Sequence, residues 1–201
     1  MYIKAVTERV TFEVAKGDVV QAGIVISNSE IGAGSVRIEP MLFRLVCLNG
    51  MISASSMRKY HVGGRHEGDD VQELLTDATK RQSDAAFWMQ VRDVVRGSLS
   101  EEGFGGIVAK AMAAANEPIT GHLDKVVEVA ARQFTLTEGE SAGVLRHLAT
   151  GGDLSRWGMV NAMTRFSQDI EDYDRATEFE RMGGKVIELP RNDWQQIADA
   201  A

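Results

Sequence analysis

The spacing of apolar residues changes along this chain, and that change constrains the fold more than any other feature of the sequence. Within residues 5–14 the apolar residues stand at even positions, namely Val6, Val10, Phe12 and Val14. This period of two is typical of a strand with one buried face. From about Asp69 onward, apolar residues recur every three or four positions, as they do in amphipathic helices. The sequence therefore predicts an α+β protein in which a sheet precedes the helices.

Residues 1–66 are expected to form an antiparallel β-meander that ends in a short helix, in the order β-β-β-α. Turn residues at 16–18 separate the first strand from a β-branched segment at 19–28, which favours a hairpin. A loop with glycines follows at 28–34, and alternation resumes over 35–39. An extended segment is expected over 52–60.

The apolar run Pro40–Leu48 is ambiguous, because a buried strand and a short helix both fit it. Pro40 suits the first position of a helix, and Asn49-Gly50 suits a helix C-terminal cap. These two signals favour the helix.

Residues 67–201 are expected to form a mostly helical region that packs on the sheet as part of one structural unit. The helices are expected over residues 69–99, 100–115, 121–134, 137–151, 156–168, 173–182 and 191–201. The expected caps are Asp69 and Asp70, Ser100, and Thr137 with Glu140. Gly183-Gly184 is expected to end the sixth helix, and a short strand over 185–189 follows it.

Charge is divided unevenly between these two regions. The formal net charge is −7, with +3 in residues 1–66 and −10 in residues 67–201. Charge distribution bears on partners rather than on fold. The basic excess of the first region permits a nucleic-acid surface without requiring one.

The composition favours a protein of the cytoplasm. The single Cys47 excludes an internal disulfide, which is typical of a reducing compartment. Charges within the first twenty residues argue against a signal peptide, and no apolar run reaches the roughly 20 residues of a membrane helix. The histidines lack metal-site spacing, so we expect no metal and no cofactor.

Four strings in the sequence together resemble one protein family. They are NSEIGAGSVRIEPMLFRLVCLNGM at 28–51, the pair Arg65-His66, SRWGMVNAMTRF at 155–166, and YDRATEFERMGGKVIELPRNDW at 173–194. The most specific are RLVCLNGM, the downstream pair and WGMVNAMT. Together they resemble the phage- and plasmid-borne proteins grouped as domain of unknown function 932.

This resemblance spans about residues 18–194 and implies a context rather than a chemistry. It implies a mobile-element protein that acts inside a bacterial host cell. Members are typically longer at the N-terminus, so this chain is expected to be a compact or shortened version. The β-β-β-α start is similar in outline to the core of phage single-strand annealing proteins, which form rings and hold DNA in a basic groove.

Arg44 is the most informative charge, because a guanidinium within the apolar run MLFRLVCL must be paired or must bind an anion. An internal ion pair with Glu39 or Glu13 is one interpretation, and a phosphate is the other. The residues predicted to bind nucleic acid are Arg37, Arg44, Arg58, Lys59, Arg65 and His66. The alternative for this set is a solvated sheet face.

Two functional hypotheses follow from these features. The first is an accessory protein that forms a homo-oligomer and binds single-stranded DNA, with a role in annealing or recombination. The second is a protein-binding module, such as an inhibitor of a host defence or DNA-processing enzyme, that uses its acidic helices. An enzyme is the least favoured hypothesis, because no acid, base and nucleophile converge. Cys47 lies between Val46 and Leu48 and is expected to be a buried, inert thiol.

Overall fold

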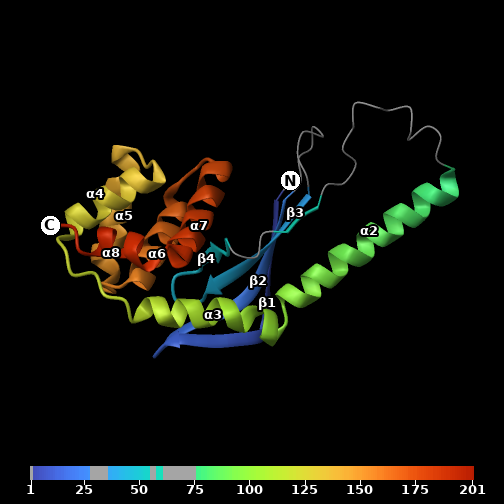
Figure 1. The fold of residues 1–201 in the computed structure, drawn as a ribbon, viewed down its shortest axis with the longest axis horizontal. Helices are drawn as coiled ribbons and strands as arrows, with labels where there is room; N and C mark the ends of the chain where they lie inside the picture. The colour runs from blue at the N-terminus through green and yellow to red at the C-terminus, as the bar shows by residue number, and fades with distance from the viewer. Residues whose placement is uncertain (1, 28–35, 55–57, 61–75) are drawn as a thin grey trace.

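The computed structural model describes residues 2–27, 36–54, 58–60 and 76–201. An antiparallel sheet is followed by helices, so the α+β class predicted from the sequence is confirmed (Figure 1). Neighbouring strands run in the order β1 (Tyr2–Ala15), β2 (Asp18–Ser27), β3 (Val36–Arg44) and β4 (Asn49–Ile52), and β5 (Arg58–Tyr60) pairs with β3.

The predicted meander of the first three strands is confirmed. In the register of the hairpin, Ala15 lies opposite Asp18, and Gly17 in the turn has a φ of 82°, which glycine adopts without steric cost. Strand β2 then pairs with β3 from Val20 opposite Arg44 to Ser27 opposite Arg37. The loop expected at 28–34 lies outside the described residues.

The helix expected over Pro40–Leu48 is wrong. Strand β3 continues to Arg44, a turn follows, and Asn49-Gly50 begins β4 instead of capping a helix. Met41 and Leu42 are consecutive, and each is 1% exposed. A strand buried on both faces has no alternation, so this run lacks the pattern that identifies strands.

Seven α-helices are described after the sheet. They are α2 (Asp77–Ser98), α3 (Glu101–Ala115), α4 (Leu123–Phe134), α5 (Glu138–Gly151), α6 (Arg156–Phe166), α7 (Tyr173–Glu188) and α8 (Arg191–Ala198), with a short 3-10 turn, η1 (Ser167–Asp169), after α6. None of these described helices is long and apolar enough to cross a membrane.

The caps predicted at Ser100 and at Thr137 with Glu140 are confirmed. The Ser100 hydroxyl accepts from the Gly103 N–H at 3.1 Å. Thr137 and Glu140 form a reciprocal capping box, in which each side chain accepts from the backbone N–H of the other. Helix α2 begins at Asp77 with Thr76 as its cap, and the predicted caps Asp69 and Asp70 lie outside the described residues.

Helix α7 does not end at Gly183-Gly184, and the strand expected over 185–189 is wrong, because the helix continues to Glu188. A Cβ on Gly184 would lie only 1.9 Å from the Ile52 carbonyl oxygen. Gly184 therefore permits close packing of α7 against β4, and Gly183 permits close packing of α7 against Thr164 of α6, instead of ending the helix. Arg156 marks the true end of α7, where its guanidinium donates to three carbonyl oxygens.

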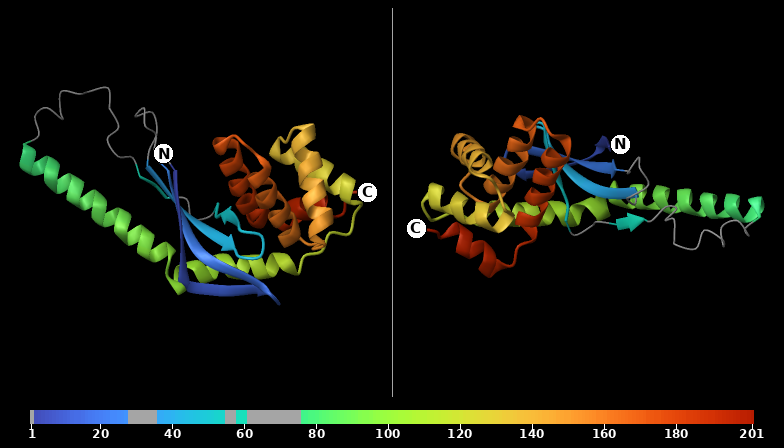
Figure 2. Two further views of the ribbon diagram at one scale, coloured as in Figure 1. Left: turned by 180° about the vertical axis from the view of Figure 1, so that it is seen from behind. Right: turned by 90° about the horizontal axis from the view of Figure 1, so that it is seen from above.

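The main core joins one face of the sheet to the helices. Phe12 of β1 packs against Phe104 of α3, with ring centroids 5.9 Å apart. Trp157 of α6 and Phe179 of α7 are at most 1% exposed and belong to the same core. Burying side chains of this size contributes roughly 1.5–3 kcal/mol each. Helices α4 to α8 gather at one end of the sheet in both views of Figure 2.

Helix α2 extends away from this core (Figures 1 and 2). It contacts β2 and β3, but none of its residues is buried. Its apolar stripe, Phe87, Val91, Val94 and Val95, is half-buried, and Trp88 is 65% exposed.

Glu39 is the most completely buried charge in the described sheet, at 0% exposed. Both of its carboxylate oxygens accept from Arg181 of α7, at 2.9 and 2.6 Å. A bidentate pair of this kind fixes the helix on the strand and compensates the desolvation of the carboxylate. Lys4 and Glu180 make a second link between sheet and α7, at 2.7 Å.

Replacing Arg181 with leucine is expected to lower the free energy of unfolding by about 3 kcal/mol, because it leaves the Glu39 carboxylate buried without a counter-ion. Urea titration measures this change. The double variant E39L/R181L should be more stable than R181L alone. Arg191→Leu, at an exposed position on α8, is the matched control and should change stability by less than about 0.5 kcal/mol. Equal stability of R181L and R191L would contradict the assignment.

Glu140 links the start of α5 to α7. Hydrogen bonds from Arg175, at 2.7 and 2.8 Å, together with those from Thr137, lower the pKa of Glu140 from 4.5 to about 2. Glu180 shows the opposite effect, because burial raises the pKa of its carboxyl. As the pH falls, the protein therefore loses the stabilisation that ionised Glu140 provides, whereas protonation of Glu180 removes the cost of burying its charge.

Because the folded state favours ionised Glu140, its contribution is complete above about pH 5 and is lost as the pH falls from 4.5 towards 2. We expect Glu140→Gln to cost about 2 kcal/mol at pH 7 and much less near pH 3. Chemical denaturation at both pH values measures the difference. Glu138→Gln, at an exposed position in the same first turn, is the matched control and should change stability at pH 7 by less than about 0.5 kcal/mol.

Candidate nucleic-acid interface

Three of the residues predicted to bind nucleic acid lie together at one end of the sheet. Arg37 of β3 is directly opposite Lys59 of β5 in the strand register, and Arg58 is opposite Ile38. Arg37 is half-buried. This arrangement places two cations at paired positions of neighbouring strands.

The structure does not bring Arg44 to that cluster. Arg44 lies seven positions further along β3, which corresponds to about 23 Å at 3.3 Å per residue. Arg65 and His66 lie outside the described residues. The predicted set is therefore divided, and the cationic cluster at that end of the sheet is the directly paired Arg37 and Lys59.

Arg44 forms an internal ion pair, as one of its two interpretations predicted, but with a different partner. Its Nε donates to Asp18 Oδ1 at 2.5 Å, and its Nη1 donates to Cys47 Sγ at 3.3 Å. Of the partners expected from the sequence, Glu39 pairs with Arg181, and Glu13 accepts from the backbone of the turn at Gly17. Pairing of β2 with β3 sets Arg44 beside the start of β2, where Asp18 lies.

Asp18 joins the sheet to α6. It is 7% exposed, and its Oδ2 accepts from Trp157 Nε1 at 2.7 Å while its Oδ1 binds Arg44. Each oxygen of the carboxylate therefore has its own donor, one from the sheet and one from the helix. The sequence predicted Asp18 as a turn residue only.

A pocket opens beside this ion pair, with a volume of about 230 Å³. Its polar lining residues come from β3, the turn after it, α5, the segment between α5 and α6, and α6; they are Arg44, Cys47, His147, Thr150, Asp153, Asn161 and Arg165. Cys47 is half-buried, so the expectation of a buried thiol is wrong. The turn at 45–48 leaves its side chain beside the pocket instead of in the core.

The two strings most specific to the family resemblance meet at this pocket. RLVCLNGM and WGMVNAMT are more than a hundred residues apart in the sequence, yet Asn49 Nδ2 donates to Thr164 Oγ1 at 2.5 Å. Gln168, just beyond the second string, donates to the Leu48 carbonyl oxygen at 2.7 Å. The two segments are therefore in direct contact in the folded chain.

Asp169 lies behind the pocket and orients His147. Its Oδ2 is 2.7 Å from both His147 Nε2 and Arg146 Nη2. The hydrogen bond with His147 contributes most to lowering the pKa of the Asp169 carboxyl below its ordinary value. Asp169 is therefore ionised at neutral pH and holds the imidazole ring in place.

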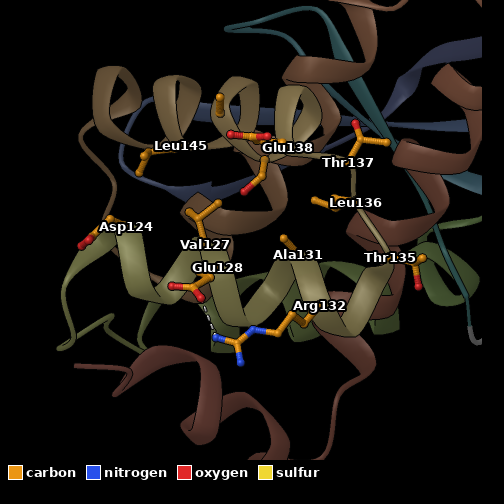
Figure 3. A pocket seen from close by; sticks show the side chains of 12 residues that line it. Asp124, Val127, Glu128, Ala131, Arg132, Thr135, Leu136, Thr137, Glu138 and Leu145 are labelled. Carbon is orange, nitrogen blue, oxygen red and sulfur yellow. Dashed lines mark hydrogen bonds and ion pairs between the residues drawn. The ribbon is translucent and has the colours of Figure 1, made fainter.

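A second hollow, of about 640 Å³, lies between α4 and α5 (Figure 3). Its floor includes Val127, Ala131 and Leu145. Its rim carries the charged residues Asp124, Glu128, Arg132 and Glu138, and Glu128 binds Arg132 at 2.9 Å. Lys125 and Arg132 lower the pKa of Glu128. This rim is predominantly acidic and does not suit a phosphate.

Among the described residues, no three His, Cys, Asp or Glu side chains are grouped closely enough to hold a metal ion. A family model for the domain of unknown function 932 (DUF932) matches residues 1–182. The chain belongs to this family. No curated protein and no solved structure matches it. The DUF932 match includes the whole sheet and α2 to α6, and it ends within α7, just after Arg181.

Asn161 and Arg165 are site residues that the sequence analysis missed. They are four residues apart on α6, and such residues lie on the same face of a helix. That spacing was visible in the sequence. The contact between this face of α6 and the turn after β3 is long-range, so no local stretch of sequence reveals it.

Substituting Asp18 with asparagine is expected to cost about 2 kcal/mol of unfolding free energy, because the amide NH₂ must face either Arg44 or Trp157, both of which are donors. Thermal and urea unfolding measure the loss. Asp84→Asn, at an exposed position on α2, is the matched control. Adding Trp157→Phe removes one of the two donors, so D18N should cost less in that background; an unchanged cost would contradict the proposed hydrogen bonds.

Proposed function

We propose that this DUF932 protein is a phage- or plasmid-encoded accessory protein that binds single-stranded DNA and self-associates. The observation that carries the proposal is the pairing of Arg37 with Lys59 across β3 and β5, with Arg58 adjacent. Like charges directly opposite one another destabilise a sheet, whereas a phosphate between them is attractive to both. This end of the sheet is therefore suited to an anionic backbone.

The likeness seen in the sequence, rather than the fold, points to a single strand as the ligand. The similarity to phage single-strand annealing proteins rests on a β-β-β-α start, of which the structure keeps the meander and replaces the short helix with β4. Contacts with phosphates supply affinity that is independent of base sequence, as annealing requires. The family strings support a mobile-element origin and hence action in the cytoplasm of a bacterial host.

Two surfaces support self-association. Among the described strands β1 pairs only with β2, and it exposes Ile3 and Val6 to 46% and 41%. An edge strand of this kind is a template for pairing with another chain. Helix α2 adds the exposed side chains of Trp88 and Met89. A second copy that covers either surface would remove apolar area from water.

One observation favours a second candidate function, namely a protein-binding module. The α4–α5 hollow has an apolar floor and a largely acidic rim, which suits a basic amphipathic segment of a host protein. A pull-down from a bacterial lysate tests this function. Stoichiometric recovery of one host protein with the parent chain but not with the Glu128→Lys variant, together with no binding of DNA, would favour it over the first.

The DNA proposal is tested by fluorescence anisotropy with a labelled single strand over a series of salt concentrations. We expect Arg37→Gln and Lys59→Gln each to weaken binding and to reduce the slope of log K against log salt by about 0.7, the value for one lost phosphate contact. Light scattering with and without DNA measures the accompanying change in oligomeric state.

Arg132→Gln is the matched control, because it removes one positive charge from an exposed position on α4. It should leave the slope unchanged. No binding at low salt, or equal effects of R37Q, K59Q and R132Q, would overturn the proposal. A double-stranded probe of the same sequence should bind more weakly than the single strand.

A further inference from the structure

The pocket beside Arg44 contains donors that lack acceptors. Asn161 Nδ2 is buried and has no hydrogen-bond partner. Arg165 is half-buried, and within the described part of the chain it has neither a hydrogen bond nor an ion pair. Buried donors without partners are rare in folded proteins and call for an explanation. A bound acceptor group supplies one.

These donors approach the pocket from different elements. Asn161 and Arg165 are one turn apart on α6, Arg44 projects from β3, and His147 lies on α5. Two of these residues are held by carboxylates that do not line the pocket. Asp18 binds Arg44, and Asp169 binds His147. The pocket is therefore organised before any ligand enters.

Three charged residues line the pocket, namely the cations Arg44 and Arg165 and the carboxylate of Asp153. Asp18 offsets the charge of Arg44, and Asp153 also lines the pocket, where its Oδ1 accepts from Ser155 Oγ at 2.6 Å. Asp169 offsets Arg146. Arg165 lines the pocket and makes no ion pair within the described part of the chain, although its charge helps to lower the pKa of the Asp169 carboxyl.

We propose that this pocket binds a phosphate group. A tetrahedral anion presents acceptors in several directions, which matches donors that come from β3 and α6, whereas a carboxylate presents two oxygens in one plane. The volume of 230 Å³ equals about eight water molecules at ~30 Å³ each. A phosphate group therefore fits within the pocket. The group is either free or the end of a longer molecule.

This site is distinct from the proposed DNA-binding cluster. Arg37 and Lys59 lie towards the other end of β3, and neither lines the pocket. Occupation of the pocket does not require DNA along the sheet. Inorganic phosphate is therefore a probe that separates this proposal from the preceding one.

The test is a titration of the full chain with inorganic phosphate at constant ionic strength, followed by calorimetry and by NMR chemical shifts. We expect saturable binding that Arg165→Gln weakens at least about tenfold, because the charge-assisted hydrogen bonds are lost. Arg191→Gln, which removes an exposed charge on α8, should bind like the parent protein.

Asn161→Leu is the second variant, and its expected effect is one that a purely structural role would not produce. Leucine is similar in volume and removes the buried donor, so the variant should melt at a higher temperature than the parent without phosphate. It should also lose the rise in melting temperature that phosphate gives the parent. Reduced stability of N161L without ligand, or full retention of phosphate binding, would overturn the proposal.

Two further probes distinguish the source of the phosphate. An oligonucleotide with a 5′-phosphate is compared with the same strand bearing a 5′-hydroxyl, each with the parent protein and with R165Q. A preference for the 5′-phosphate that R165Q abolishes supports a strand terminus as the ligand. Saturable binding of inorganic phosphate without that preference supports a small phosphate compound. Absence of both effects refutes a phosphate site.

Discussion

The buried carboxylate of Glu39 is the interaction on which the architecture depends most. It lies in β3, the strand that pairs with β2, β4 and β5, and its two oxygens are neutralised by Arg181 from α7. A charge buried at such a position tolerates no alternative packing, because any displacement of α7 leaves it without a partner. The pair therefore fixes the position of the C-terminal helices relative to the sheet, and with it the pocket between them.

Asp18 repeats this arrangement on a smaller scale. It joins Arg44 of the sheet to Trp157 of α6, and thereby holds Arg44, one of the residues that line the pocket. The helices thus serve as more than a cover for the sheet. They provide the counter-charges and donors that make a cluster of buried polar groups stable, and they leave Asn161 Nδ2 buried without a hydrogen-bond partner.

Local patterns predicted the hairpin and most helix starts, because alternation and capping depend on neighbouring residues. They failed where a residue serves a distant contact. Pro40–Leu48 lost its alternation since β3 is buried on both faces, and Gly183-Gly184 permits close packing instead of ending a helix. The partner of Arg44 was likewise missed, because turn chemistry explained Asp18 without it. For the proposed site, the sequence suggested a set of cations as candidates, but the division of that set between the two ends of β3 required the strand register.

The separation of the joined residues along the chain has a consequence for how the protein reaches its native state. Asp18 and Trp157 are 139 residues apart, and Lys4 and Glu180 are 176 apart. Contacts of such long range slow folding, since a large loop must close before they form. During synthesis the meander emerges well before α7. Glu39 therefore has no counter-ion, and β3 is incompletely covered, until Arg181 has been synthesised. The sheet therefore leaves the ribosome with part of its surface uncovered, and the helices in the last third of the chain cover that surface later.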